Sequence, residues 1–403
     1  MKVVILHDHI GGTQPGRAEK TMAVQYRFRL SVTLSAIVVG LLALATACGN
    51  DGGASPTGTS QATRTPSDSP MLEVQGIADW INSEPLTISD LTAEGNVVLV
   101  DFWTYTCVNC LRTLPFLRDW HAKYADRGLV ILGVHSPEFE FEKVPENVRK
   151  AVADEGVGWA VALDNDFATW NAFGNRYWPA KYLIDTSGKV IYSHFGEGEY
   201  AETEQEIRDA LEAAGHDVSD IDAGTVDNRD RDSGATRVTR EIYGGYGRSY
   251  GGGLYAGNEQ YYIAPDRTLE YMDDGNYVND RYYLEGMWTN AEQAIIHARG
   301  TENLEDHIAL RIQARSANVV VEPQGPEPFD VFVFLDGNPL TAEEAGDDVM
   351  FDDQGRSYIT VDEPRMYRIV EQPEFAERVL KLASNSDNFA MFAFTFGVYE
   401  EGF

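Results

Sequence analysis

Apolar and polar residues alternate in blocks along residues 97–214, and these blocks predict strands and helices in turn. Two short, continuous apolar runs, residues 97–100 and 129–134, are typical of buried strands. A helix-like run, residues 111–124, lies between them. Further blocks predict a helix over 144–155, a strand over 159–163, a short helix over 167–173, a β-hairpin after Pro179 and a helix over 204–214. This alternation predicts an α/β domain over residues 71–217.

Beyond residue 237 the pattern changes to short alternating segments that turn residues separate. These segments are residues 294–298, 307–314, 318–322, 331–335, 357–361, 366–370, 378–383 and 389–397. Several short strands at this spacing predict an all-β sandwich of the jelly-roll kind over residues 237–403. Residues 218–236, which are rich in Asp, Gly, Ser, Thr and Arg, are expected to form the linker between the two domains.

The N-terminal region contains an uncharged apolar run, residues 30–47, that Arg27 and Arg29 precede and Cys48 follows. A basic start, an apolar core and small residues predict a secretory signal. The end of the run resembles a bacterial lipobox, which implies that Cys48 is lipidated and that residues 1–47 are removed. An uncleaved signal anchor and plain secretion are the alternatives, and all three place the rest of the chain outside the cytoplasm. Whether translation starts at Met1 or Met22 stays open.

Composition extends this prediction. Residues 48–70 are mostly Gly, Ser, Thr, Pro and other polar residues, which predicts a flexible tether behind the lipid anchor. The whole chain has 64 acidic and 32 basic residues, a net charge of −32, and the acidic residues are spread along it. Such a charge argues against nucleic acid as a partner, and it leaves the lipid anchor as the expected contact with the membrane.

The strongest chemical motif is the pair Cys107 and Cys110, which stands between the first predicted strand and the helix that follows it. A cysteine at a helix N-terminus is favoured as the thiolate, which is the form that attacks disulfides. Half a zinc site and a purely structural disulfide are the alternatives. The chain has only one other cysteine, Cys48, and no second Cys-x-x-Cys. Redox chemistry is therefore favoured, with the Cys107–Cys110 disulfide as the redox group, no other cofactor and no metal.

The residues around this motif resemble the thioredoxin superfamily. Asp101-Phe102-Trp103 precedes Cys107, and Pro115 stands five residues after Cys110. The family also has a cis-proline that faces the disulfide, and the best match is Pro179. The phrase from Phe102 to Pro115, with Gly-Val-His-Ser-Pro-Glu-Phe after it, is similar to the TlpA/ResA-like branch. It is most similar to the soluble part of the DipZ family, without that family's CcdA-like membrane domain.

The resemblance implies roles for individual residues. Cys107 is expected to attack the substrate, Cys110 to resolve the mixed disulfide, and Asp101 to accept the proton of Cys110. His135 is expected to be a strand-end or surface histidine rather than a catalyst. The groove for the substrate chain is expected to be lined by Trp103, Trp178 and Pro179.

The same resemblance implies the partners. Exported thiol or disulfide proteins are the expected substrates, and a separate CcdA-like membrane protein is the expected electron donor of a reductase. A peroxiredoxin-like activity is the alternative within this fold, because Thr104 stands three residues before Cys107. However, Val100 occupies the place of the proline in that motif.

The C-terminal region is similar to that of the DipZ family, which resembles carbohydrate-binding modules. Glycan is therefore a candidate ligand, and the candidate contacts are Tyr261, Tyr262 and Trp288. The alternatives are that these aromatic residues form the sandwich core, and that the whole chain is a surface glycan-binding protein with an accessory redox domain. The acidic loop at residues 347–353 is expected to be a solvated turn, with calcium binding as its alternative.

Overall fold

The structure is a computed structural model, and it describes residues 72–224, 237–249 and 253–398. The predicted leader, Cys48, the tether and both candidate start residues lie outside the described residues. Within the described part of the chain, no helix combines the length and the apolar character needed to cross a membrane.

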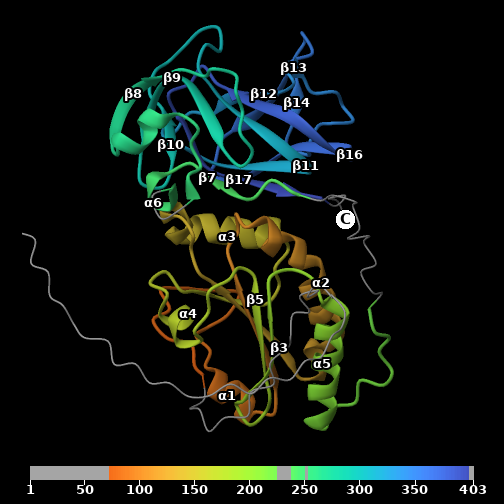
Figure 1. The fold of residues 1–403 in the computed structure, drawn as a ribbon. Helices are drawn as coiled ribbons and strands as arrows, with labels where there is room; N and C mark the ends of the chain where they lie inside the picture. Colours follow the sequence, from red (N-terminus) through yellow and green to blue (C-terminus); the bar gives the residue numbers. More distant parts are fainter. Residues whose placement is uncertain (1–71, 225–236, 250–252, 399–403) are drawn as a thin grey trace, which may run out of the picture. The chain divides into compact units, whose positions relative to one another are not determined.

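The first domain is built on a six-stranded sheet in the order β1-β4-β3-β2-β5-β6 (Figure 1). Its strands are β1 (Trp80–Ile81), β2 (Val97–Trp103), β3 (Leu129–His135), β4 (Ala160–Leu163), β5 (Ala180–Ile184) and β6 (Val190–Phe195). The three central strands β2, β3 and β4 are parallel, whereas β1, β5 and β6 run antiparallel to their neighbours. The helices are α1 (Ile88–Ala93), α2 (Val108–Tyr124), η1 (Ala125–Arg127), η2 (Glu140–Lys143), α3 (Pro145–Asp154), α4 (Ala168–Ala172) and α5 (Tyr200–Ala213). The predicted thioredoxin-like α/β domain is confirmed.

Strand β2 separates two apolar layers because its side chains alternate between the faces of the sheet. Val98, Val100 and Phe102 pack in the layer that contains residues of α1 and α4. Leu99 and Trp103 pack on the opposite face, in the layer that contains residues of α2 and α5. Asp101 shares this second face by the same alternation, so its carboxyl group lies on the side of the sheet that α2 covers.

Two helices begin three or four residues earlier than predicted. Helix α2 begins at Val108 rather than at residue 111, and Pro115 lies within it. Helix α5 begins at Tyr200 rather than at residue 204. Its first residue explains the extension, because the Tyr200 ring stacks on Phe116 of α2 with ring centroids 3.6 Å apart.

The start of the predicted linker packs on the first domain. The Arg208 guanidinium donates to the carbonyl oxygens of Val218 and Ile221 at 3.1 and 2.8 Å. The side chain of Val218 is fully buried. The chain therefore remains attached to the first domain over residues 218–224.

The second domain is an all-β antiparallel domain, as predicted. Its described strands are β7 (Ile242–Tyr243), β8 (Arg267–Tyr271), β9 (Tyr282–Asn290), β10 (Ile295–His297), β11 (His307–Pro323), β12 (Phe329–Leu335), β13 (Asn338–Pro339), β14 (Met350–Phe351), β15 (Ser357–Val361), β16 (Arg365–Ala383) and β17 (Phe389–Gly397). Two short helical turns, α6 (Tyr246–Arg248) and η4 (Glu259–Ile263), accompany them.

Strands β11 and β16 are longer than predicted, and each joins two predicted segments. The polar residues that separated the predicted segments lie at irregularities of the pairing, such as the one between Ala314 and Ser316. Strand β11 pairs with β9 over residues 307–310 and with β17 over residues 316–323. This change of neighbour lets the strands surround one apolar core, which includes Ile308, Val319 and Trp288.

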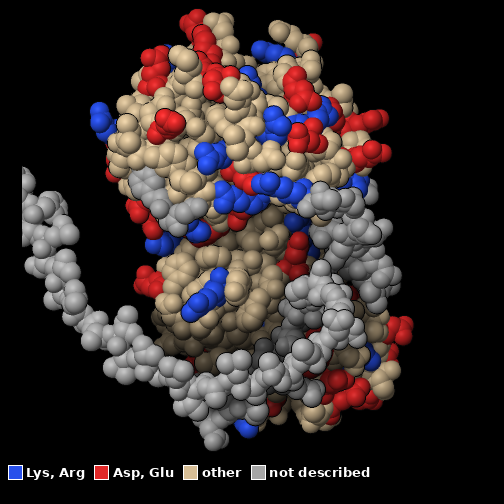
Figure 2. Space-filling view, in the orientation of Figure 1, with Lys and Arg blue, Asp and Glu red and all other residues tan. Residues whose placement is uncertain are grey.

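The two domains share an apolar contact. Phe139 and Phe141, which follow β3, pack against Phe392 of β17 with ring centroids 5.2 and 5.0 Å apart. Acidic side chains are visible on both domains in Figure 2, in agreement with their spread along the sequence.

Candidate active site

The two cysteines lie at the N-terminal end of α2, where β2 delivers the chain. Cys107 is the N-cap residue, and its Sγ accepts a hydrogen bond from the Cys110 backbone N–H at 3.3 Å. Cys107 is half-buried, whereas Cys110 is 1% exposed. Burial raises the pKa of the Cys110 thiol well above its usual range, and the neighbouring Cys107 adds to this effect. One sulfur is therefore accessible, and the other is held beneath it as a thiol.

Asp101 and Lys181 form a buried pair of opposite charge behind the cysteines. Both side chains are almost fully buried, and Lys181 Nζ lies 3.9 Å from Asp101 Oδ1. Neither of these two atoms has a hydrogen-bond partner. Desolvation raises the pKa of Asp101 to about 6, although the Lys181 charge opposes the shift. Burial likewise lowers the pKa of Lys181. The site thus holds a carboxyl group of raised pKa near the buried thiol.

Sequence reasoning missed Lys181, although a signal was present. It is a charged residue inside the apolar strand β5, two positions after Pro179. Strand pairing places it opposite Asp101, because β5 runs antiparallel to β2 in that register. A lysine in a strand that is buried throughout needs a partner, and Asp101 is the nearest acid.

The predicted groove residues lie at two different depths. The peptide bond between Trp178 and Pro179 is cis. Trp178 lines the same pocket as Cys107, and its indole N–H donates to the Ser136 carbonyl at 3.0 Å. Trp103, in contrast, is 1% exposed and packs edge-on against His135, so it supports the site from the core and offers no surface to a substrate.

Two further titratable residues lie behind the site. His135 lies at the end of β3, as predicted, but it is fully buried rather than at the surface, and burial lowers its pKa to about 3, which leaves the ring neutral. Glu142 is also fully buried, and it was not predicted. Its carboxylate accepts hydrogen bonds from Thr106 Oγ1 at 2.6 Å and from the Phe139 backbone N–H at 2.9 Å. Burial raises the pKa of Glu142 to about 7. Glu142 thereby anchors the residue directly before Cys107.

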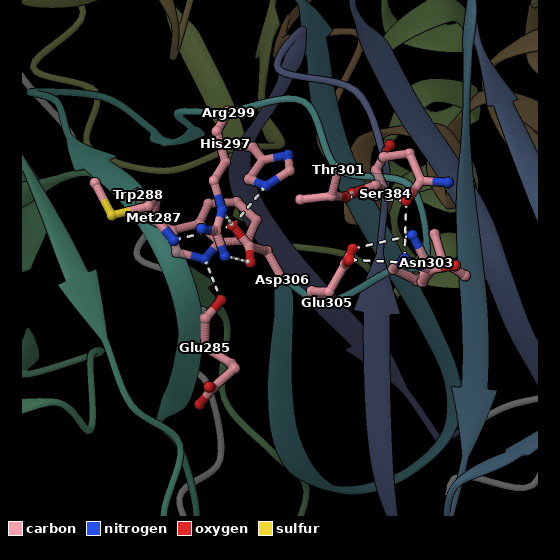
Figure 3. Close-up of polar contacts among 12 residues, drawn as sticks. Glu285, Met287, Trp288, His297, Arg299, Thr301, Asn303, Glu305, Asp306 and Ser384 are labelled. Carbon is pink, nitrogen blue, oxygen red and sulfur yellow. Dashed lines mark hydrogen bonds and ion pairs between the residues drawn. The ribbon is translucent and has the colours of Figure 1, made fainter. Parts of the chain in front are cut away.

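The aromatic residues proposed as glycan contacts belong largely to the core of the second domain. Tyr261 and Trp288 are fully buried, and Tyr262 is partly buried against the same core. The Trp288 indole N–H donates to the Glu285 carbonyl at 2.7 Å, and its ring lies beside His297 (Figure 3). Because these rings interact with their own domain, Tyr261 and Trp288 present no face on which a sugar can stack.

Arginines outside the acidic loop pair with most of its aspartates. Asp352 accepts from Arg356 Nε at 2.7 Å, and Asp348 accepts from Arg365 Nη2 at 2.8 Å. Among the described residues there is no group of three or more His, Cys, Asp or Glu side chains placed to hold a metal ion.

Comparison with known proteins defines the class of this protein. Residues 80–211 match the Redoxin family, and residues 239–397 match a family described as the thioredoxin-like C-terminal domain. Thiol-disulfide oxidoreductase YkuV of Bacillus subtilis is 32% identical over 129 residues, which are 32% of this chain and 84% of YkuV. The chain therefore belongs to the thiol–disulfide oxidoreductases of the thioredoxin superfamily.

A more extensive match covers both domains. Protein DipZ of Mycobacterium tuberculosis is 33% identical over 331 residues, which are 81% of this chain and 42% of DipZ. The chain thus spans less than half the length of the DipZ proteins that it matches. Thiol-disulfide oxidoreductase ResA of Halalkalibacterium halodurans is 25% identical over 139 residues, 34% of this chain and 73% of ResA. The match to DipZ is longer than either domain alone, so it includes residues of both.

Proposed function

We propose that this enzyme reduces disulfides of exported proteins and that Cys48 tethers it to the outer face of the bacterial cell membrane. The observation that carries the proposal is the contrast between the two thiols. Cys107 is accessible at a helix N-terminus, whereas Cys110 is buried with its pKa raised. A nucleophile and a resolving thiol need these different environments.

The proposed reaction has two steps. The Cys107 thiolate attacks one sulfur of the substrate disulfide, and a bond forms between Cys107 and that sulfur. The other substrate sulfur leaves as a thiolate and takes up a proton. The Cys110 thiol then gives its proton to Asp101 and attacks Cys107 Sγ, and the bond between Cys107 and the substrate breaks. The second substrate sulfur leaves as a thiolate and takes up a proton. The substrate disulfide gains two electrons, and the enzyme dithiol becomes the Cys107–Cys110 disulfide.

Asp101 suits the second step because of its surroundings. A general base works best when its pKa lies near the working pH. Desolvation raises the pKa of Asp101 to about 6, and Asp101 Oδ1 has no donor that would compete for the proton. We therefore assign Asp101 as the group that receives the Cys110 proton.

A reductase must be reduced again after each turnover. We propose that a separate CcdA-like membrane protein supplies these electrons, as the resemblance to the DipZ family implies. The tether over residues 48–70 would let the folded part reach both the membrane donor and exported substrates.

Insulin reduction tests the activity. The wild-type protein should reduce insulin in the presence of dithiothreitol, and Cys107→Ser should show only the uncatalysed rate. Equal rates for the two proteins would refute the proposal. Cys110→Ser should instead accumulate a mixed disulfide with its substrate, which a non-reducing gel followed by mass spectrometry would identify.

The redox potential of the Cys107–Cys110 couple tests the direction. A reductase requires a low potential, near the thioredoxin end of the range at about −270 mV. A value near about −120 mV would show an oxidase instead.

A further inference from the structure

Cys107 opens into a pocket that both domains line. The cavity has a volume of about 240 Å³. The first domain contributes Cys107, Val108, Asn109, Glu138 and Trp178, and the second contributes Glu241, Tyr243, Arg248, Thr395 and Phe396. A substrate segment that reaches Cys107 through this pocket must therefore contact the second domain.

Specific contacts hold the second-domain wall in place. Arg248 Nη2 lies 2.9 Å from Glu138 Oε1, and the Tyr243 hydroxyl lies 2.8 Å from the same oxygen. The Arg248 guanidinium also covers the Tyr243 ring at 4.7 Å. Beneath these polar contacts lies the apolar contact of Phe139 with Phe392. These contacts fix the second-domain residues in the wall of the pocket beside Cys107.

The size of the pocket limits what can enter. It is smaller than the pockets of roughly 300–1,000 Å³ that hold drug-sized ligands. A volume of about 240 Å³ has room for a few side chains of one extended segment. A disulfide in a flexible segment fits this space, whereas a rigid folded surface does not.

The charges of the pocket favour a cation. Glu138 already neutralises Arg248 through their ion pair. Glu241 Oε2 lies 2.8 Å from the Tyr243 hydroxyl, and no Lys or Arg among the described residues forms an ion pair with Glu241. Glu241 is exposed at the edge of the pocket, so a bound substrate can reach its carboxylate. The net charge of −32 adds to the negative potential around it.

We infer that the second domain selects substrates for the disulfide exchange, and that Glu241 favours disulfides with a lysine or arginine next to the cysteine. This inference rests on the proposed function. Under this inference the second domain contributes to substrate recognition directly at Cys107.

The selection should depend on pH. Desolvation and the nearby Glu138 charge raise the pKa of Glu241 to about 7, although the Tyr243 hydroxyl and the Arg248 charge oppose the shift. The groups that face Glu241 are Glu138, Tyr243 and Arg248; burial raises the pKa of Tyr243, and ion pairing raises that of Arg248. Tyr243 therefore stays neutral and Arg248 stays charged between pH 6 and pH 8. Because Glu241 gains its charge across this range, the preference for a basic substrate should increase from pH 6 to pH 8.

The test uses the full chain and two peptide disulfides that differ only in having Lys or Glu next to each cysteine. The measured quantity is the ratio of the two kcat/KM values, determined at low salt. The titration of the cysteines and of Asp101 affects both peptides equally, so it cancels in this ratio. We expect the wild-type protein to prefer the Lys peptide by roughly two- to fivefold at pH 8. Glu241→Gln should lower this ratio, and Glu241→Lys should lower it further.

Glu374→Gln is the matched control, because Glu374 is an exposed acid of β16 outside the pocket and the variant has the same net charge as Glu241→Gln. It should keep the wild-type ratio. A wild-type ratio of one, or the same ratio in wild type and Glu241→Gln, would overturn the inference while turnover of both peptides still supports the proposed function. Turnover of neither peptide by the wild type would overturn the proposed function, and the inference with it.

Discussion

Each domain buries an aspartate next to basic groups, but the two aspartates differ in their hydrogen-bond partners. In the first domain Asp101 faces Lys181 at 3.9 Å, and neither Asp101 Oδ1 nor Lys181 Nζ has a hydrogen-bond partner. In the second domain Asp306 accepts hydrogen bonds from Arg299 at 2.5 and 2.8 Å and from the Met287 backbone N–H at 3.0 Å.

The pKa shifts of the two aspartates are also in opposite directions. Desolvation raises the pKa of Asp101 to about 6. Burial acts in that direction on Asp306 too, but hydrogen bonds from Arg299, Met287 and His297 outweigh it and lower the pKa. A buried charge with a full set of donors stabilises a fold, whereas one without them stays free to exchange a proton. The comparison therefore separates a structural aspartate from the one that we propose as the proton acceptor.

Removal of the structural aspartate should have the largest effect on stability. Asp306→Ala leaves the buried His297 ring and the Met287 N–H without their acceptor, so we expect a loss of about 3 kcal/mol in the free energy of unfolding. Urea denaturation would measure it. Disulfide exchange by the folded fraction should not change. A loss below about 1 kcal/mol would show that the Asp306 cluster is not structural.

Removal of the reactive aspartate should change how stability depends on pH. The folded pKa of Asp101 is about 6 and the ordinary value is 3.8, so the folded state holds a proton that the unfolded state has lost between these values. The contribution of Asp101 to wild-type stability should therefore fall, by up to about 3 kcal/mol, as pH rises from 4 to 7. Asp101→Asn lacks this titration, so its stability should improve relative to wild type over this range.

Denaturation curves of both proteins at pH 4, 5.5 and 7 would test this prediction. Glu142, whose pKa is about 7, titrates in both proteins, so its contribution cancels in the difference. A difference that does not vary with pH would contradict the assignment of a raised pKa to Asp101.

Asp101→Asn should also slow the resolution of the mixed disulfide. Without the proton acceptor, resolution by Cys110 at pH 7 should be about 100-fold slower in Asp101→Asn, while formation of the mixed disulfide at Cys107 keeps its rate. Rapid acid quenching followed by mass spectrometry separates the two steps. Equal slowing of both steps would argue that Asp101 supports the structure of the site rather than proton transfer.

The smallest effect is expected at the acidic loop, where Asp347, Asp348 and Asp352 already have arginine partners. Asp352 binds Arg356, and Asp348 binds Arg365. Because these aspartates are satisfied, as Asp306 is, added calcium or a chelator should shift Tm by less than about 1 °C. Differential scanning calorimetry with and without calcium checks this expectation, and a larger shift would reveal a calcium site.

Local sequence patterns predicted most elements of the first domain. The apolar runs at residues 97–100 and 129–134 became β2 and β3, and the cysteines were correctly placed at a helix N-terminus. Contacts between distant residues could not be predicted in this way. The burial of Lys181 against Asp101 depends on the register of β5 on β2, which no local pattern contains.

The second domain was predicted less completely, for two reasons. Long strands such as β11 bend at irregularities, so polar residues inside them were interpreted as turns. Tyr261 and Trp288 are amphipathic and can line either a surface or a core, and only the fold decides between these environments. The pocket at Cys107 could not be foreseen, because the sequence separates Glu241 from Cys107 by more than a hundred residues.

The packing of Phe139 and Phe141 on Phe392 has a consequence for the history of the gene. Domain shuffling can join or separate modules freely only where their surfaces are water-soluble on their own. Here a break between the two coding regions would leave aromatic rings uncovered on both products, and each product would tend to aggregate. Selection should therefore keep the two regions together, and a descendant that loses one half must also replace these rings with polar residues.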